Sequence, residues 1–239
     1  MSRDRPRPRE NHLLSRLPPA ELERLRPLLQ PVRLRRKQIL ERPGEPSSYV
    51  YFPLSGVSSV VSIMEDGATV EVATVGRDGL IGLSAFFGTD TTPFQVFAQI
   101  PGEVMRMPAP AFRAAIDAPG QLQRLVGRYA EARFIQTAQS AACNRLHAVE
   151  QRCARWLLMS HDRLGVDRFS LTHEFLAQIL GVRRSSVTVA ARALQEAGAI
   201  RYAYGVITVM NRPALEAASC ECYQIIAGEF ERLLGFRRS

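Results

Sequence analysis

Histidine and cysteine are scarce in this chain and unevenly placed. The 239 residues include four cysteines and four histidines, and residues 13–142 contain neither type. A cupin-type oxygenase needs several histidines and a carboxylate around its metal, and an iron–sulfur cluster needs about four cysteines, so neither fits this stretch. A haem would need His, Cys or Met, but Met64, Met105 and Met107 lie in strand-like segments, where methionine is usually core.

The cysteines are Cys143, Cys153, Cys220 and Cys222. They are too few, and lie too far along the chain, to form a disulfide framework. The spacing of Cys220 and Cys222 is not that of a zinc ribbon and no second cysteine pair answers it, so the sequence predicts no metal site. Cys143 is interpreted as a small buried hydrophobe, and a redox switch across a dimer axis is the alternative.

Long apolar runs are lacking too. No run approaches bilayer length, and the start, MSRDRPRPRE, is followed by no signal-peptide core, which predicts a cytoplasmic protein without a membrane partner. Lys and Arg outnumber Asp and Glu by 31 to 23, a formal net charge of +8. The excess lies mostly in residues 121–239, with 16 basic and 10 acidic residues. This balance favours an anionic partner such as nucleic acid.

The first half of the chain divides into two segments. Residues 1–12 are predicted to form a disordered basic arm. Residues 13–119 begin with two short helices interrupted by prolines, continue into short runs rich in β-branched and aromatic residues, and close on a short helix. Such strands, at intervals of about 8–12 residues, predict a small β-barrel or double-sheet roll.

A long helix is predicted next. Residues 121–164 contain no Pro and one Gly and are rich in helix formers, which indicates a helix broken once. Residues 120–147 are assigned to dimerisation, because residues recur along them near heptad positions. The residues near these positions are Leu122, Leu125, Tyr129, Ala132, Gln136, Cys143 and Leu146. His147 and His161 are interpreted as interface or surface residues, and Trp156 as a core residue of a C-terminal domain over 148–239.

Residues 172–192 read THEFLAQILGVRRSSVTVAAR. Thr172 is a typical N-cap. Ala177 is small where a second helix crosses, and Gly181 lies where the chain must turn with positive φ. A small residue, a glycine four positions later, and apolar residues one, six and nine positions beyond it form a helix-turn-helix pattern. Residues 201–209 then read as a hairpin with its turn near Gly205, the wing of a winged helix.

The order of these parts resembles the CRP/FNR family of bacterial transcription regulators. The resemblance covers about residues 13–210 and rests most on SYVYFPLSGVSSVV, VGRDGLIGLSAFFG and LTHEFLAQILGVRRSSVTVAARALQEAGAI. It implies an α+β chain with a cyclic-nucleotide-binding-like β-roll, a dimerisation helix and a winged helix-turn-helix. It also implies a homodimer on a palindromic operator in double-stranded DNA, contact with RNA polymerase and no enzymatic activity. The helical segment from Pro213 onward lies outside the match.

The resemblance also implies that the second helix enters the major groove. Three positions near its start read base edges in relatives, commonly as Arg, Glu and Arg, whereas this chain has Arg184, Ser185 and Val189. Arg184 can bond guanine in a bidentate way and Val189 can touch a thymine methyl, so we expect a different target sequence. Contacts to phosphates are predicted for Thr172, Arg183, Ser186, Thr188 and Arg192.

The sensor half departs from the cyclic-nucleotide binders of the family. Those proteins carry a Gly-Glu pair and, shortly after it, an arginine; here Gly82 is followed by Leu83, and the arginine position falls near Pro93. A buried phosphate without its arginine loses its main counter-charge, which argues against cyclic AMP. The effector is unknown and no cofactor is predicted. The candidate ligand contacts are Gly82, Leu83, Ser84 and Thr137, the last of which matches a nucleobase contact in relatives.

Two other classes of function compare with this one. A ligand-binding or scaffold protein could use the winged helix for protein contacts, and the basic lean of the C-terminal half argues against this reading without excluding it. An enzyme finds no support, because the sequence shows no nucleophile–base pair, metal cluster or phosphate loop.

Overall fold

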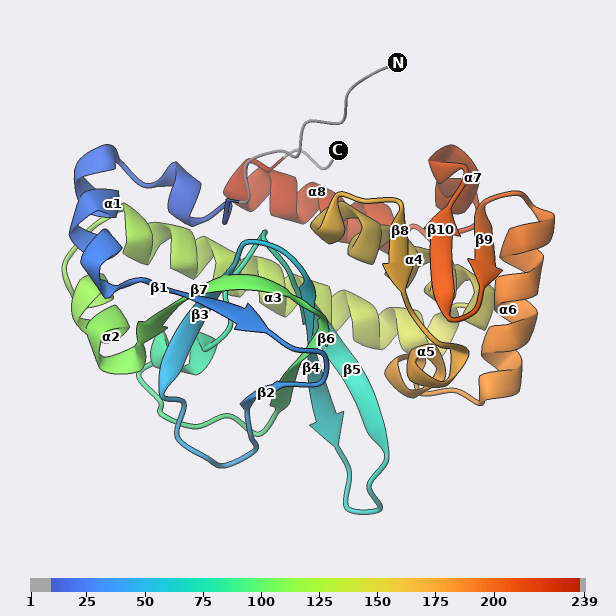
Figure 1. Ribbon diagram of the computed structural model, residues 1–239, viewed down its shortest axis with the longest axis horizontal. Helices are drawn as coiled ribbons and strands as arrows, with labels where there is room; N and C mark the ends of the chain where they lie inside the picture. Colours follow the sequence, from blue (N-terminus) through green and yellow to red (C-terminus); the bar gives the residue numbers. More distant parts are fainter. Residues whose placement is uncertain (1–9, 237–239) are drawn as a thin grey trace.

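The structure, a computed structural model, describes residues 10–236. A β-roll and a group of small helices with a hairpin lie side by side along one long helix, as Figure 1 shows. The predicted disordered arm, residues 1–12, falls mostly outside the described residues. Its last part, residues 10–12, is described, and there the prediction of disorder is wrong. Asn11 is buried and its side-chain amide donates to the backbone oxygens of Pro53 (3.0 Å) and Gly79 (2.8 Å), so the ordered chain begins before residue 13.

The roll is made of two antiparallel sheets after a short helical entry. The entry comprises a 3-10 turn Leu14–Arg16, α1 (Pro19–Leu25) and a second 3-10 turn Arg26–Leu28. One sheet has the order β1-β7-β3 and the other the order β2-β6-β4-β5. The strands are β1 (Gln30–Leu34), β2 (Ile39–Glu41), β3 (Tyr49–Pro53), β4 (Val57–Ile63), β5 (Thr69–Val75), β6 (Gln95–Ile100) and β7 (Gly102–Pro108). A 3-10 turn, Leu83–Ala85, lies between β5 and β6. This arrangement confirms the predicted roll.

Three helices follow the roll: α2 (Ala109–Asp117), α3 (Gln121–Leu146) and α4 (Val149–Leu164). The predicted long helix is broken once, where His147 and Ala148 adopt extended backbone between α3 and α4. Among the described helices, none is both long and apolar enough to span a membrane.

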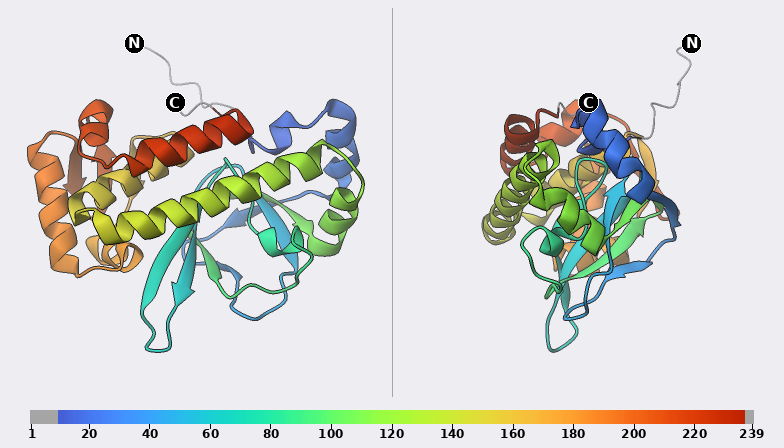
Figure 2. Two further views of the ribbon diagram at one scale, coloured as in Figure 1. Left: turned by 180° about the vertical axis from the view of Figure 1, so that it is seen from behind. Right: turned by 90° about the vertical axis from the view of Figure 1, so that its left-hand side faces the viewer.

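The C-terminal part contains the predicted helix-turn-helix and hairpin. It comprises β8 (Arg168–Ser170), α5 (His173–Leu180), α6 (Arg184–Glu196), β9 (Ile200–Ala203) and β10 (Val206–Val209), and the three strands pair in the order β8-β10-β9. Two further helices close the chain, α7 (Arg212–Ala217) and α8 (Cys222–Leu234). Figure 2 shows α8 lying alongside α3 and running back toward the entry helices.

The packing of α3 corrects the predicted heptad seam. Tyr129 is buried, donates its hydroxyl to the Leu80 oxygen (3.1 Å) and meets the ring of Phe230 on α8 edge-on. Gln136 is buried and donates to the Thr74 hydroxyl (3.3 Å). Six of the seven seam residues are buried inside this chain, because the roll and α8 both pack on α3; the exception, Leu146, is exposed.

A different face of α3 stays open. Phe134 is 74% exposed, and Thr137, Ala138 and Ala141 lie exposed on the same face, three to four residues apart. We call these four residues the outer stripe of α3. An exposed phenylalanine among small residues is a surface to which a second helix can pack closely.

Candidate nucleic-acid interface and effector cavity

The turn between α5 and α6 is built as the sequence predicts. Thr172 caps α5, since its hydroxyl accepts from the Phe175 amide (3.2 Å). Gly181 has φ +63°, and the following Val182 amide returns to the Ala177 oxygen (3.0 Å). This left-handed residue satisfies the end of α5 and sends the chain directly into α6. The side-chain oxygen of Thr172 is therefore engaged in the cap.

Helix α6 has one buried and one open face. Val187, Ala190, Ala191 and Leu194 are buried against α4 and α5. The open face carries five of the predicted contacts: Arg184, Ser185, Thr188, Val189 and Arg192. They share it because they are spaced by four residues in two neighbouring rows. Val189 is 70% exposed, which is costly for an apolar side chain unless a partner covers it.

The other predicted contacts lie at the edge of this face. Arg183 is exposed immediately before α6, whereas Ser186 and Thr172 are half-buried. Arg184 lies 3.9 Å from Glu174, and Arg192 lies 2.8 Å from Glu196. All four of these side chains are well exposed, so the ion pairs are weak and leave the guanidinium groups free to exchange partners.

The wing adds a residue that the sequence reasoning missed. Tyr204 lies at the tip of the β9–β10 hairpin with φ +50° and a fully exposed ring. The ring of His173, at the start of α5, stacks on Tyr202 of β9 at 4.1 Å and its Nδ1 lies 3.1 Å from the Thr188 hydroxyl. Burial and the nearby Arg184 lower the pKa of His173. Tyr204 could have been found from the sequence, because an aromatic residue directly before the turn glycine, Gly205, lies at the tip of the hairpin.

A cavity of about 390 Å³ lies between the roll and α3. Gly82, Leu83, Ser84 and Thr137, the predicted ligand contacts, all line it. Gly82 has φ +95°, and a Cβ there would come within 3.0 Å of the Tyr49 oxygen, so the loop runs too close to β3 for a side chain. The position of the glutamate in the sequence pattern of cyclic-nucleotide binders is filled here by the apolar Leu83.

Two charged residues of the cavity, Glu41 and Arg133, are not among the contacts predicted from the sequence. Glu41 is buried, accepts from the Ser47 hydroxyl (2.6 Å), and has its pKa raised by burial. Arg133 projects from α3 and donates to the Thr74 oxygen (3.0 Å). Its spacing of four residues from Thr137 puts both on one face of the helix, which is the signal that could have found it. A cation thus reaches the cavity from α3, not from the loop near Pro93.

The roll and the C-terminal part meet at the β4–β5 hairpin. Trp156 of α4 is buried, as predicted, but its indole N–H donates across to Glu71 of β5 (2.7 Å). Burial raises the pKa of Glu71 to about 7, against hydrogen bonds from Ser59 and Trp156 that lower it. Gln178 of α5 donates to the Thr69 hydroxyl (2.6 Å). We call these contacts the hairpin junction.

Cys143 lies in a second place where distant segments meet. Its sulfur is 3.5 Å from that of Cys220, and Cys222 is 3.5 Å from His147. In each pair the two residues are more than seventy positions apart in the sequence, so they meet only because α8 packs beside the end of α3.

Two family models match the chain in this order. Residues 31–118 match the cyclic nucleotide-binding domain, and residues 151–218 match the Crp-like helix-turn-helix domain. Among curated proteins, the global nitrogen regulator of a Synechocystis strain is 26% identical over 183 residues, 72% of this chain and 81% of that protein.

Solved structures share the fold at low sequence identity. FixK2 from Bradyrhizobium japonicum aligns with a TM-score of 0.70 at 18% identity, over 80% of this chain and 98% of that one. A CRP/FNR-family transcriptional regulator from Thermus thermophilus aligns with a TM-score of 0.61 at 18% identity, over 80% and 98%.

A sensor-type roll joined by a long helix to a winged helix-turn-helix defines a transcription regulator with a DNA-binding domain. The chain belongs to the CRP/FNR family.

Proposed function

We propose that this chain acts as a homodimer that recognises an inverted repeat in double-stranded DNA through the open face of α6. The observation that carries the proposal is this face: two guanidinium groups, two hydroxyls and an uncovered Val189, all on one side of a helix held by a left-handed glycine turn. Arginine can read guanine, and an exposed valine suits a thymine methyl. A dimer would present two such helices to half-sites about one turn of DNA apart.

The outer stripe of α3 supports pairing of two copies. Phe134 has no partner of its own among the described residues that would cover it, and the small Ala138 and Ala141 continue the stripe toward the DNA-binding part. Substituting Phe134→Glu would place a charge in the middle of this surface. We expect a monomer in sedimentation analysis and a loss of about 100-fold or more in DNA affinity, because linked half-sites gain that much by avidity.

The cavity supports a small-molecule effector. Its volume is in the range of ligand sites, its walls are mostly apolar, and Arg133 and Glu41 supply fixed polar groups. Phe134 and Thr137 belong to both the cavity lining and the outer stripe, so an occupant would touch the surface that pairs. The missing loop arginine argues against cyclic AMP. Contact with RNA polymerase, a cytoplasmic location and the lack of catalytic activity belong to the same proposal.

Selection of genomic fragments at moderate salt tests DNA recognition. We expect an enriched palindromic motif; no enrichment, or binding abolished by heparin competitor, would favour a scaffold protein that uses the winged helix for protein contacts. Arg184→Ala should cost roughly 1–3 kcal/mol at a single base pair of each half-site. Arg183→Ala is the matched control: it should weaken all sequences alike and reduce the salt slope by about one unit per half-site.

A further inference from the structure

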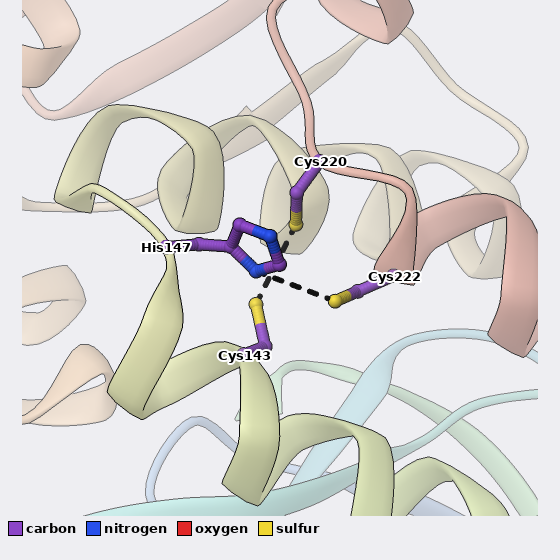
Figure 3. A group of neighbouring side chains, drawn as sticks. All are labelled: Cys143, His147, Cys220 and Cys222. Atoms are coloured by element: carbon purple, nitrogen blue, oxygen red, sulfur yellow. Dashed lines mark hydrogen bonds between the residues drawn. The ribbon is translucent and has the colours of Figure 1, made fainter.

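Three of the four cysteines and one histidine converge where α3 ends and α8 begins. Cys143 lies in the last turn of α3, and His147 directly follows that helix. Cys222 is the first residue of α8, and Cys220 lies two residues before it. Figure 3 shows the imidazole ring and the three sulfurs facing one another. One ligand atom from each of the four residues lies within 4.8 Å of all the others. We propose that these four residues bind one Zn²⁺ ion in a tetrahedral Cys₃His site that fastens α8 to α3.

The distances suit a single metal ion. With Zn–S bonds of about 2.3 Å and Zn–N bonds of about 2.0 Å, tetrahedral ligands lie about 3.5–3.8 Å apart. The Cys143 and Cys220 sulfurs are 3.5 Å apart, as are the Cys222 sulfur and Nδ1 of His147. An iron–sulfur cluster would hold its cysteines farther apart, since several irons and bridging sulfides lie between them. Three thiolates and an imidazole are donors that zinc prefers.

The surrounding groups match the needs of a metal site. Nε2 of His147 lies 3.2 Å from the carboxylate of Glu221, so Nδ1 is left to face the sulfurs. A carboxylate behind a ligating histidine fixes its tautomer and raises its basicity. Gln139 donates to the Cys222 sulfur at 3.1 Å, as a donor to a thiolate would.

Charge is balanced around the four residues. Three thiolates and Zn²⁺ carry a net charge of −1, and the thiol protons are released to solvent on binding. Arg152 interacts electrostatically with both Cys143 and Cys220, and Arg155 interacts with Cys143.

The alternative that the three cysteines are only small buried hydrophobic residues explains the cluster less well. Cys153 shows what that state looks like in this chain: it is fully buried in α4, apart from the other three, and burial raises its pKa to about 12. The cluster differs, because a polar imidazole enters it and an amide donates to one of its sulfurs. A disulfide between Cys143 and Cys220 would leave Cys222 and His147 facing each other without a function.

The test is metal analysis of the full-length chain purified without chelator. Elemental analysis should find about one zinc per chain, and exchange for Co²⁺ should give a thiolate-to-cobalt charge-transfer band with the visible bands of tetrahedral cobalt. Protein that holds neither metal after reduction of its thiols overturns the proposal. So does stoichiometric iron with cluster absorption, or a Cys143–Cys220 disulfide that takes up no zinc once reduced.

Variants locate the site. Cys222→Ser should abolish stoichiometric zinc, while Cys153→Ala, the matched control, should keep it; equal retention in both would overturn the assignment. If Cys222→Ser fails to fold, Glu221→Gln is the second variant to measure. It should lower zinc affinity about 10–100-fold in competition with a chromogenic chelator, and unchanged affinity would contradict the role of Glu221. These measurements need no DNA, so they stand apart from the proposed function.

Discussion

Two of the contacts that join distant parts of this molecule use different chemistry. The hairpin junction holds the roll to α4 and α5 through a buried carboxyl, an indole and an amide. The Cys₃His cluster holds α8 to the end of α3 through sulfur and imidazole. The first contact depends on whether Glu71 is protonated, and the second on whether a metal is bound. Two of the links between the C-terminal helices and the rest of the chain therefore depend on different conditions, one on proton binding and the other on metal binding.

Removal of zinc should have the largest effect and should act on one link only. At a free concentration 1,000-fold above the dissociation constant, a bound ion stabilises the folded chain by about 4 kcal/mol, which the stripped protein would lose. Hydrogen exchange should speed up in α8 while β5 keeps its protection. Faster exchange in β5 to the same extent would show that the two links are one cooperative unit.

Glu71→Gln should have the next largest effect, and its sign depends on pH. The folded pKa of about 7 lies above the ordinary value of 4.5, so the folded chain binds the proton more tightly than the unfolded chain. Stability from this group is fully present below pH 4.5 and is lost as the pH rises through 7. The glutamine keeps an acceptor for Trp156 without the charge.

Chemical denaturation at several pH values measures this difference. We expect the variant to be more stable than the native chain by up to about 3 kcal/mol above pH 8, with no advantage near pH 4.5. Glu150→Gln, an exposed position on α4, is the control and should change little at any pH. A variant that gains nothing at high pH would mean that Glu71 is not desolvated.

Trp156→Phe should be smaller in effect. It removes the donor to Glu71 while keeping an aromatic ring in the core, and we expect a loss of about 2 kcal/mol in the free energy of unfolding at pH 7. A double-mutant cycle with Glu71→Ala, which removes the acceptor that Glu71→Gln keeps, isolates the pair. Strictly additive losses would show that the hydrogen bond contributes nothing and that Trp156 acts only by packing.

Gln178→Ala should have the smallest effect at the same junction. Its hydrogen bond to Thr69 is short but exposed to solvent, so we expect a change within about 0.5 kcal/mol by thermal denaturation. A loss above about 1 kcal/mol would reverse the ranking and make this bond, not the buried carboxyl, the main support of the hairpin junction.

The sequence predicted the DNA-binding part well because its signals are local. The cap at Thr172, the turn at Gly181 and the alternation of buried and open residues on α6 all lie within about twenty residues. The candidate ligand contacts from Gly82 to Ser84 came from a motif, and they line the cavity. Glu41 and Arg133 reach that cavity from elements remote in sequence, so a loop motif could not reveal them.

The errors on α3 have a common physical cause. Its apolar periodicity reports burial but does not say by what, and the covering surfaces are the roll and α8 within the same chain. The position of α8 was outside the family match, and so the pairing of Cys143 with Cys220 was not foreseen. One local sign was present: Cys143 and His147 are four residues apart, which is a spacing that suits a shared ligand.

The return of α8 toward the entry helices has a consequence for biosynthesis. The Phe236 ring lies edge-on to His12 at 5.0 Å, and Arg16 hydrogen-bonds the Gly235 oxygen. Residues of the entry segment thus pack on partners that are translated 219 residues later, and contacts that span so much of the chain form slowly. A nascent chain that had not yet formed α8 would expose the side chains of α3 that α8 covers, such as Tyr129.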